Sequence, residues 1–96
     1  MKQGFRIIDT HTHVGVARHS GRRYSAEELL RDMDRHGVDR SVVIPWPVVD
    51  DYRASHDEIG RAVKAHADRL IGAASLYPYI PEREFRTEVK RCAEMH

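Results

Sequence analysis

Three short apolar runs alternate with three amphipathic stretches along this chain of 96 residues. The apolar runs have the length of buried strands, whereas the stretches between them repeat apolar residues at helical spacing. The expected strands span residues 5–9, 40–44 and 70–76. This alternation predicts an α/β fold whose strands pair in parallel through right-handed crossovers.

The expected helices carry recognisable signals at their ends. Residues 25–28 form a capping box, in which a Ser hydroxyl and a Glu carboxylate satisfy free backbone N–H groups, and Gly37 suits a left-handed stop. Residues 55–58 repeat the capping-box pattern and predict the start of the second helix there. Pro81 suits the first turn of a third helix, whose apolar stripe includes Cys92 as an expected core residue.

The segment Asp9-Thr10-His11-Thr12-His13-Val14-Gly15 follows the first apolar run. Side chains alternate along a strand, so His11 and His13 are expected to point the same way as Asp9. Their Cβ atoms would lie about 6.6 Å apart, twice the rise of a strand. Two imidazoles at this spacing can converge on one cation at about 2.0–2.1 Å. The segment therefore predicts half of a metal site at the C-terminal tip of the first strand.

Three segments together resemble the amidohydrolase superfamily, in particular its amidohydrolase-related branch of metal-dependent hydrolases and non-oxidative decarboxylases. The first is Ile-Ile-Asp-Thr-His-Thr-His-Val-Gly at residues 7–15, which is similar to the family's first strand. The second is His-Gly-Val-Asp-Arg-Ser-Val-Val-Ile-Pro at 36–45, and the third is Ala-Asp-Arg-Leu-Ile-Gly-Ala-Ala-Ser-Leu-Tyr-Pro at 67–78. The resemblance implies a (β/α)₈ TIM barrel.

Such a barrel usually takes about 250 residues. The chain is long enough for about three βα units, so residues 1–96 are expected to form the N-terminal part of one barrel domain. We expect a piece of a longer protein or a truncated reading frame. The resemblance places the remaining metal ligands and the acid–base group on later strands, so the 96-residue chain alone is expected to be inactive.

The resemblance assigns roles to a few residues. His11 and His13 are the expected ligands of a divalent ion, zinc first and manganese next, and Asp9 is expected to orient them rather than to bind the ion. Arg22, in a basic loop at 18–23, and Trp46, after the second strand, are weaker candidates for contacting a small substrate, such as a carboxylate. The other histidines are not expected to be ligands: His19, His36, His56, His66 and His96.

The expected reaction is hydrolysis of a C–N or C–O bond by a metal-activated water. Non-oxidative decarboxylation of an unsaturated or aromatic acid is the first alternative. Phosphoesterases of the polymerase-and-histidinol-phosphatase type and TatD-type nucleases share the first-strand motif but fit the later segments less well. A small α/β binding module and a fragment without function are the alternatives outside enzymes.

Composition sets further bounds. With 16 basic and 15 acidic residues the net charge is +1, which predicts no general attraction to nucleic acid or to an anionic membrane. The single cysteine excludes an intrachain disulfide framework and fits a reducing, cytoplasmic setting. No apolar stretch approaches the ~18 residues of a membrane span. A homo-oligomeric parent protein is left open.

Overall fold

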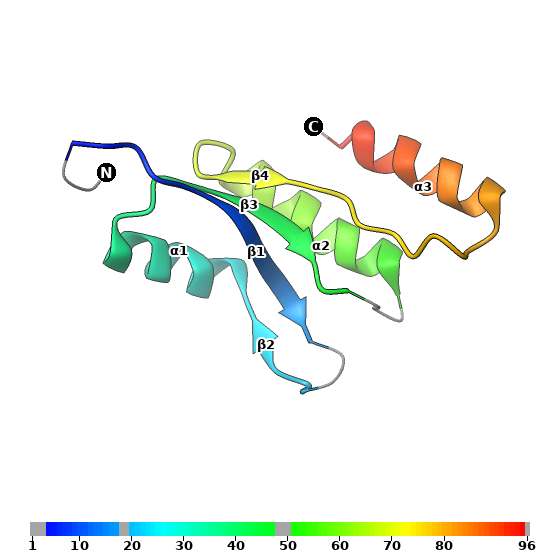
Figure 1. Cartoon of the computed structure of the whole chain (residues 1–96), viewed down its shortest axis with the longest axis horizontal. Helices are drawn as coiled ribbons and strands as arrows, with labels where there is room; N and C mark the ends of the chain where they lie inside the picture. Colours follow the sequence, from blue (N-terminus) through cyan, green and yellow to red (C-terminus); the bar gives the residue numbers. More distant parts are fainter. Residues whose placement is uncertain (1–3, 18–19, 48–50, 96) are drawn as a thin grey trace.

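The computed structural model describes residues 4–17, 20–47 and 51–95 of the chain. Strands and helices alternate along this part, which confirms the α/β class (Figure 1). The elements in chain order are β1 (Ile8–Val16), β2 (Arg23–Tyr24), α1 (Ala26–His36), β3 (Arg40–Pro45), α2 (Tyr52–Ala65), β4 (Leu70–Gly72) and α3 (Glu82–Ala93).

The described strands form one sheet in the order β2-β1-β3-β4. β1, β3 and β4 are parallel neighbours in chain order, whereas β2 returns antiparallel along the last two residues of β1. Thr12 pairs with Val43, and Val43 pairs with Gly72, so these three residues lie level across the sheet. The carboxyl ends of the three parallel strands therefore meet at one edge.

The two faces of the sheet differ in burial. Along β3, the buried residues Ser41, Val43 and Pro45 alternate with half-buried ones, as expected for a strand with one covered face. The helices α1 and α2 cover that face and share one buried cluster with the strands. Its members are Val14, Leu29, Met33, Val43, Ile59, Ala62, Val63 and Leu70. The opposite face remains open.

α3 lies beside α2 (Figure 1) and contributes a charged side chain to the interior. Its one buried residue is Glu88, which is 1% exposed. The expected apolar stripe on this helix was wrong as a core face, because Val89 is 45% exposed and Cys92 is only half-buried. α3 is therefore held mainly by polar contacts.

The first and third strands differ from their expected bounds. The first was expected at residues 5–9, but β1 starts at Ile8 and continues through the whole histidine motif, because pairing with β3 reaches Val14 and pairing with β2 reaches Val16. The third ends at Gly72 instead of residue 76, since ladder pairing stops there. The motif thus lies inside a strand and not at its tip.

The second capping box was also wrong. α2 begins at Tyr52, and the carboxylate of Asp51 caps it by accepting a hydrogen bond from the Ala54 backbone N–H at 3.0 Å. Residues 55–58 lie one turn inside the helix. The first helix follows its prediction: Ser25 Oγ accepts from the Glu28 N–H at 3.1 Å, and Gly37 adopts φ +71°.

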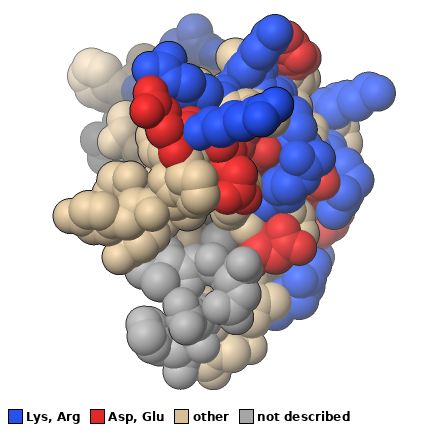
Figure 2. All heavy atoms as spheres, turned by 90° about the vertical axis from the view of Figure 1, so that its right-hand side faces the viewer, with Lys and Arg blue, Asp and Glu red and all other residues tan. Residues whose placement is uncertain are grey.

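Charges on the surface are mixed in sign. On the face that Figure 2 shows, basic and acidic side chains lie next to one another over the upper part of the molecule. One such pair on α3 joins Arg86 to Glu82 at 2.9 Å. Within the described part of the chain, no helix combines the length and the apolar character needed to cross a bilayer.

Candidate metal centre

The rings of His11 and His13 converge on the open face of the sheet. Their Nε2 atoms lie 3.2 Å apart, and the rings meet edge-on with centroids 4.9 Å apart. His13 Nδ1 donates to the Ile44 carbonyl at 2.9 Å, so Nε2 of His13 presents its lone pair toward His11. Metal-binding histidines commonly anchor their second nitrogen in this way. The expected convergence of the two rings is confirmed.

Asp9 departs from the alternation that places the two histidines together. The pairing of β1 with β3 shifts register between Asp9 and Thr12, and Asp9 pairs with Ser41, a residue of the covered face. Its Oδ1 accepts a hydrogen bond from the His11 backbone N–H at 3.0 Å. The carboxylate therefore holds the backbone at the irregularity that precedes the His11 ring.

Trp46 packs directly on one of the histidines. Its ring stacks on His13 with centroids 4.4 Å apart and an interplanar angle of 25°. The indole Nε1 is buried and has no hydrogen-bond partner among the described residues. Gly15 lies behind it with φ +108°, where an added Cβ would come within 3.9 Å of the indole. Trp46 thus restricts the orientation of the His13 ring.

One cavity of about 690 Å³ is bordered by every residue that the sequence singled out: Asp9, His11, His13, Arg22 and Trp46. Leu29 and Met33 of α1 line it from the helix side. Because β2 pairs only with the end of β1, the cavity lies along a stretch of β1 that has no strand neighbour on this side in the described chain. The cavity joins the histidine pair to this edge.

The basic loop contributes one cation with no partner in the described structure. Arg22 lines the cavity and forms no ion pair with the described residues. Arg23 instead bonds to Glu58 at 3.3 Å. Arg18 and His19, the other members of the expected basic cluster, lie outside the described residues. Also in the cavity lining, Tyr24 donates to Asp32, and burial together with that carboxylate raises the pKa of Tyr24 to about 12.

The donor set of this site fits a divalent ion in part. Two nitrogens about 2.0–2.1 Å from one ion in a tetrahedral site would lie about 3.3 Å apart, close to the observed 3.2 Å. A catalytic zinc usually has three protein ligands and an open position. Among the described residues, His11 and His13 provide two of them.

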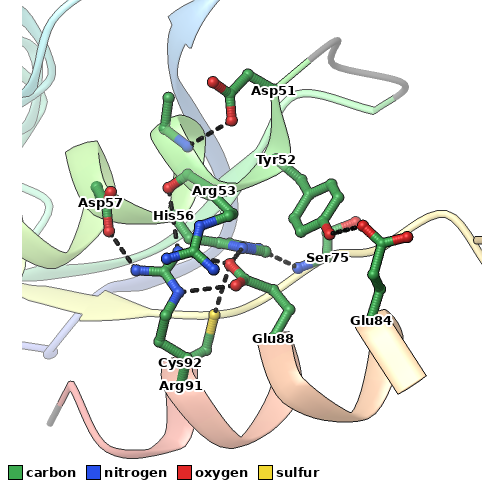
Figure 3. Close-up of polar contacts among 11 residues, drawn as sticks. Asp51, Tyr52, Arg53, His56, Asp57, Ser75, Glu84, Glu88, Arg91 and Cys92 are labelled. Carbon is green, nitrogen blue, oxygen red and sulfur yellow. Dashed lines mark hydrogen bonds and ion pairs between the residues drawn. The ribbon is translucent and has the colours of Figure 1, made fainter. Parts of the chain in front are cut away.

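A second group of potential donors lies between α2 and α3 (Figure 3). Single donor atoms of His56, Glu88 and Cys92 lie within 4.8 Å of one another. This cluster could not be predicted from the sequence, because 32 residues separate His56 from Glu88 and no local pattern connects them. The only local signal is the spacing of Glu88 and Arg91, three residues apart on one helix.

Comparison with known proteins supports the architecture. No family model matches the chain, and no curated protein gives a significant match. Among solved structures, the fold is similar to that of a probable 2-pyrone-4,6-dicarboxylic acid hydrolase from Acinetobacter baumannii, solved with citric acid bound, with a TM-score of 0.60 and 20% sequence identity. The match covers 92% of this chain and 35% of that protein, so the chain spans about a third of the neighbour's length. At this level of identity, what the two proteins share is the fold.

Proposed function

We propose that these residues form the first βα units of a (β/α)₈ barrel in a metal-dependent hydrolase of the amidohydrolase superfamily. The parallel order of β1, β3 and β4, with α1 and α2 on one face, is the arrangement of consecutive barrel units. The fold shared with part of a probable hydrolase supports the same assignment.

The histidine pair carries the proposal. His11 and His13 converge through Nε2 on the open face, beside the edge where the parallel strands end. Active sites of β/α barrels lie at the C-terminal ends of the strands. β1 is exposed from Ile8 to His11 and carries both histidines on its open face. Metal binding explains both the residue type and the convergence of the two rings.

His11 and His13 would hold the ion, zinc first and manganese second. When bound, the ion would supply Lewis acidity and lower the pKa of a bound water to about 7, which provides a nucleophile at neutral pH. The Ile44 carbonyl and the Trp46 ring set the orientation of His13, and Asp9 holds the backbone of His11. The acid–base group is not assigned to this part of the chain.

The proposed substrate is a small molecule that bears a carboxylate. Arg22 lines the cavity that contains the histidine pair and forms no ion pair with the described residues, so it is available to an anion. The structural neighbour is described as a probable hydrolase of a dicarboxylic acid, which favours the same class. We place this hydrolysis in the cytoplasm. We propose neither nucleic acid nor a membrane as a partner.

The experiment is a metal analysis of the protein that carries this sequence. We expect the purified protein to retain zinc or manganese, and the variants His11→Ala and His13→Ala to lose most of it. His66→Ala is the matched control, because His66 ends α2 and does not border the cavity. Equal metal content in the wild type and in the His11→Ala/His13→Ala double variant would overturn the proposal.

A further inference from the structure

Both ring nitrogens of His56 have partners in the interior between α2 and α3 (Figure 3). The side chain is almost completely buried, with 3% exposed. Nδ1 lies 2.6 Å from Oε2 of Glu88, and Nε2 lies 3.1 Å from the backbone nitrogen of Ser75. One ring therefore links α2 to α3 and to the segment that follows β4.

These contacts determine which nitrogen carries the hydrogen. The Ser75 backbone N–H can only donate, so Nε2 of His56 accepts with its lone pair. Nδ1 then carries the ring hydrogen and donates it to the Glu88 carboxylate. Arg91 keeps this carboxylate ionised, because its Nε and Nη2 donate to Oε1 and Oε2 at 2.7 Å each. His56 is thus a neutral ring in one tautomer, with a donor at one end and an acceptor at the other.

The segment held by Nε2 leaves the sheet at the edge where the parallel strands end, with β3 between it and the histidine pair on β1. Ser75 lies three residues after Gly72, which pairs with Val43. Trp46, which stacks on His13, also lies three residues after Val43, just beyond the end of the neighbouring strand β3. Ala73 still donates to the Val43 carbonyl at 3.0 Å. Residues 73–77 therefore follow the same edge of the sheet as Trp46.

We propose that His56 is a positioning residue that fixes residues 73–77 at the carboxyl edge of the parallel strands, the edge near which the His11–His13 pair lies, by accepting the Ser75 N–H while Glu88 holds its tautomer. We call the hydrogen-bonded chain from Ser75 through His56 to Glu88 the lock. Its importance for activity rests on the proposed function, whereas its existence does not. β4 ends at Gly72, and Ala73 still bonds to the sheet. Without an acceptor for the Ser75 N–H, little would direct the chain beyond Ala73. The lock supplies that direction from the helix layer.

The alternative occupant of this cluster is a metal ion on His56, Glu88 and Cys92. Three observations oppose it. Both ring nitrogens are already used, Arg91 already neutralises Glu88, and burial raises the pKa of the Cys92 thiol to about 11, which disfavours the thiolate that binds metals. The geometry is that of the hydrogen-bonded lock and not of a metal site.

Two substitutions separate the two ends of the ring. In His56→Asn, the amide nitrogen occupies the place of Nδ1 and can still donate to Glu88, but nothing reaches Ser75. In His56→Gln, the longer side chain places an oxygen near the site of Nε2, where it can accept the Ser75 N–H, while the donor to Glu88 is lost. Each variant is the control for the other.

The measurement is amide hydrogen exchange of the protein that carries this sequence, read at Ser75 and along α3. We expect His56→Asn to raise the exchange of the Ser75 amide about tenfold and to leave α3 unchanged. His56→Gln should preserve the protection of Ser75 and raise exchange in α3. In the wild type, the ¹⁵N shifts of the His56 ring should show hydrogen on Nδ1 alone.

Protection of Ser75 that survives His56→Asn, or a ring protonated at Nε2, would overturn the proposal. So would a zinc ion that remains in His11→Ala/His13→Ala and is lost in His56→Gln, because the ring would then be a ligand. Metal analysis of the same variants separates the two proposals. A protein without metal at His11 and His13 fails the proposed function, whereas the response of Ser75 tests the lock by itself.

Discussion

Individual contacts around His13 restrict the orientation of one ring of the proposed metal site. The Ile44 carbonyl holds Nδ1, and Trp46 covers one face of the ring. A ring restrained in both rotation and tilt presents Nε2 in one direction, so less freedom is lost when an ion binds. The site's precision therefore depends on residues that would not themselves touch the ion.

Trp46→Ala is expected to weaken metal binding about tenfold, because the His13 ring loses its stacking partner while both ligands remain. Trp46→Phe keeps an aromatic face in place and should bind nearly as well as the wild type. The check is a zinc titration of the metal-free protein with a competing chelator. Equal affinities in all three proteins would show that the stack does not orient the ligand.

Gly15 is the residue of the motif that only backbone geometry explains. Its φ of +108° lies in the region that favours glycine, and it is buried beside Trp46 and Glu58. We expect Gly15→Ala to cost about 1–3 kcal/mol of stability, read as a lower midpoint of thermal unfolding. Gly60→Ala is the control. Gly60 lies inside α2, and the added methyl would contact only the flexible side chain of Met95, so the midpoint of thermal unfolding should stay within experimental error or rise. Equal loss in both would contradict this explanation.

At the scale of elements, α3 differs from the other helices in what holds it. α1 and α2 bury apolar side chains, whereas α3 buries Glu88 and connects through Arg91 to Asp57 at 2.5 Å and to the Arg53 carbonyl at 3.2 Å. A buried carboxylate is tolerated here because a guanidinium and an imidazole satisfy it. Docking of α3 should therefore respond to pH.

Hydrogen bonds from Arg91, together with the one from His56, lower the pKa of Glu88 from 4.5 to about 2. Because the folded value is the lower one, the ionised carboxylate stabilises docking above about pH 4.5, and this contribution, about 3 kcal/mol, is lost as pH falls toward 2. Glu88→Gln should lower the protection factors of α3 amides about 100-fold at pH 6 and remove most of this acid dependence.

Glu82→Gln serves as the control for that experiment. Glu82 lies on the same helix and pairs with Arg86 at 2.9 Å, but its side chain is 78% exposed. An exposed pair contributes little, so protection of α3 should change less than about threefold. If Glu82→Gln and Glu88→Gln had the same effect, general charge on the helix would explain it and the buried pair would not.

The elements that local signals define were predicted well, and those that depend on distant pairing were not. The cap at Ser25 and the stop at Gly37 act within one turn, so the sequence shows them directly. The extent of β1 depends on partners in β2 and β3, and the cap of α2 at Asp51 competes with the capping-box pattern at residues 55–58. A pattern match does not decide which of two possible caps the chain uses.

The candidate site also has features that local patterns predict and features that depend on distant contacts. The convergence of His11 and His13 comes from a period of two residues in a strand, and the sequence predicts it. The register shift that removes Asp9 from this alternation arises only when β1 meets β3. The lock joins His56 to Ser75 and Glu88, which lie 19 and 32 positions away in the sequence, so only the folded structure reveals it.

For the whole molecule, the main feature is a sheet that helices cover on only one of its two faces. Helices cover one side, while Ile44 and Val42 on the other remain half-buried and Ile8 is 49% exposed. Along most of β1, the edge away from β3 has no strand partner within the described chain. Open edges of this kind pair with other chains, and exposed apolar faces associate. The barrel proposal explains both, because further strands would cover them.

The 96-residue chain made by itself is therefore expected to self-associate. Sedimentation velocity should detect dimers or larger species at micromolar concentration, and the chain should bind a hydrophobic dye. Ile8→Lys places a charge on the open edge of β1 and should shift the distribution toward monomer. Val89→Lys is the matched control, since Val89 is 45% exposed on the helix α3 and belongs to neither the open face of the sheet nor the free edge of β1, and it should leave association unchanged. A dye-free monomer that melts cooperatively would show that three parallel strands and their helices are stable alone, and it would remove the structural argument for further strands.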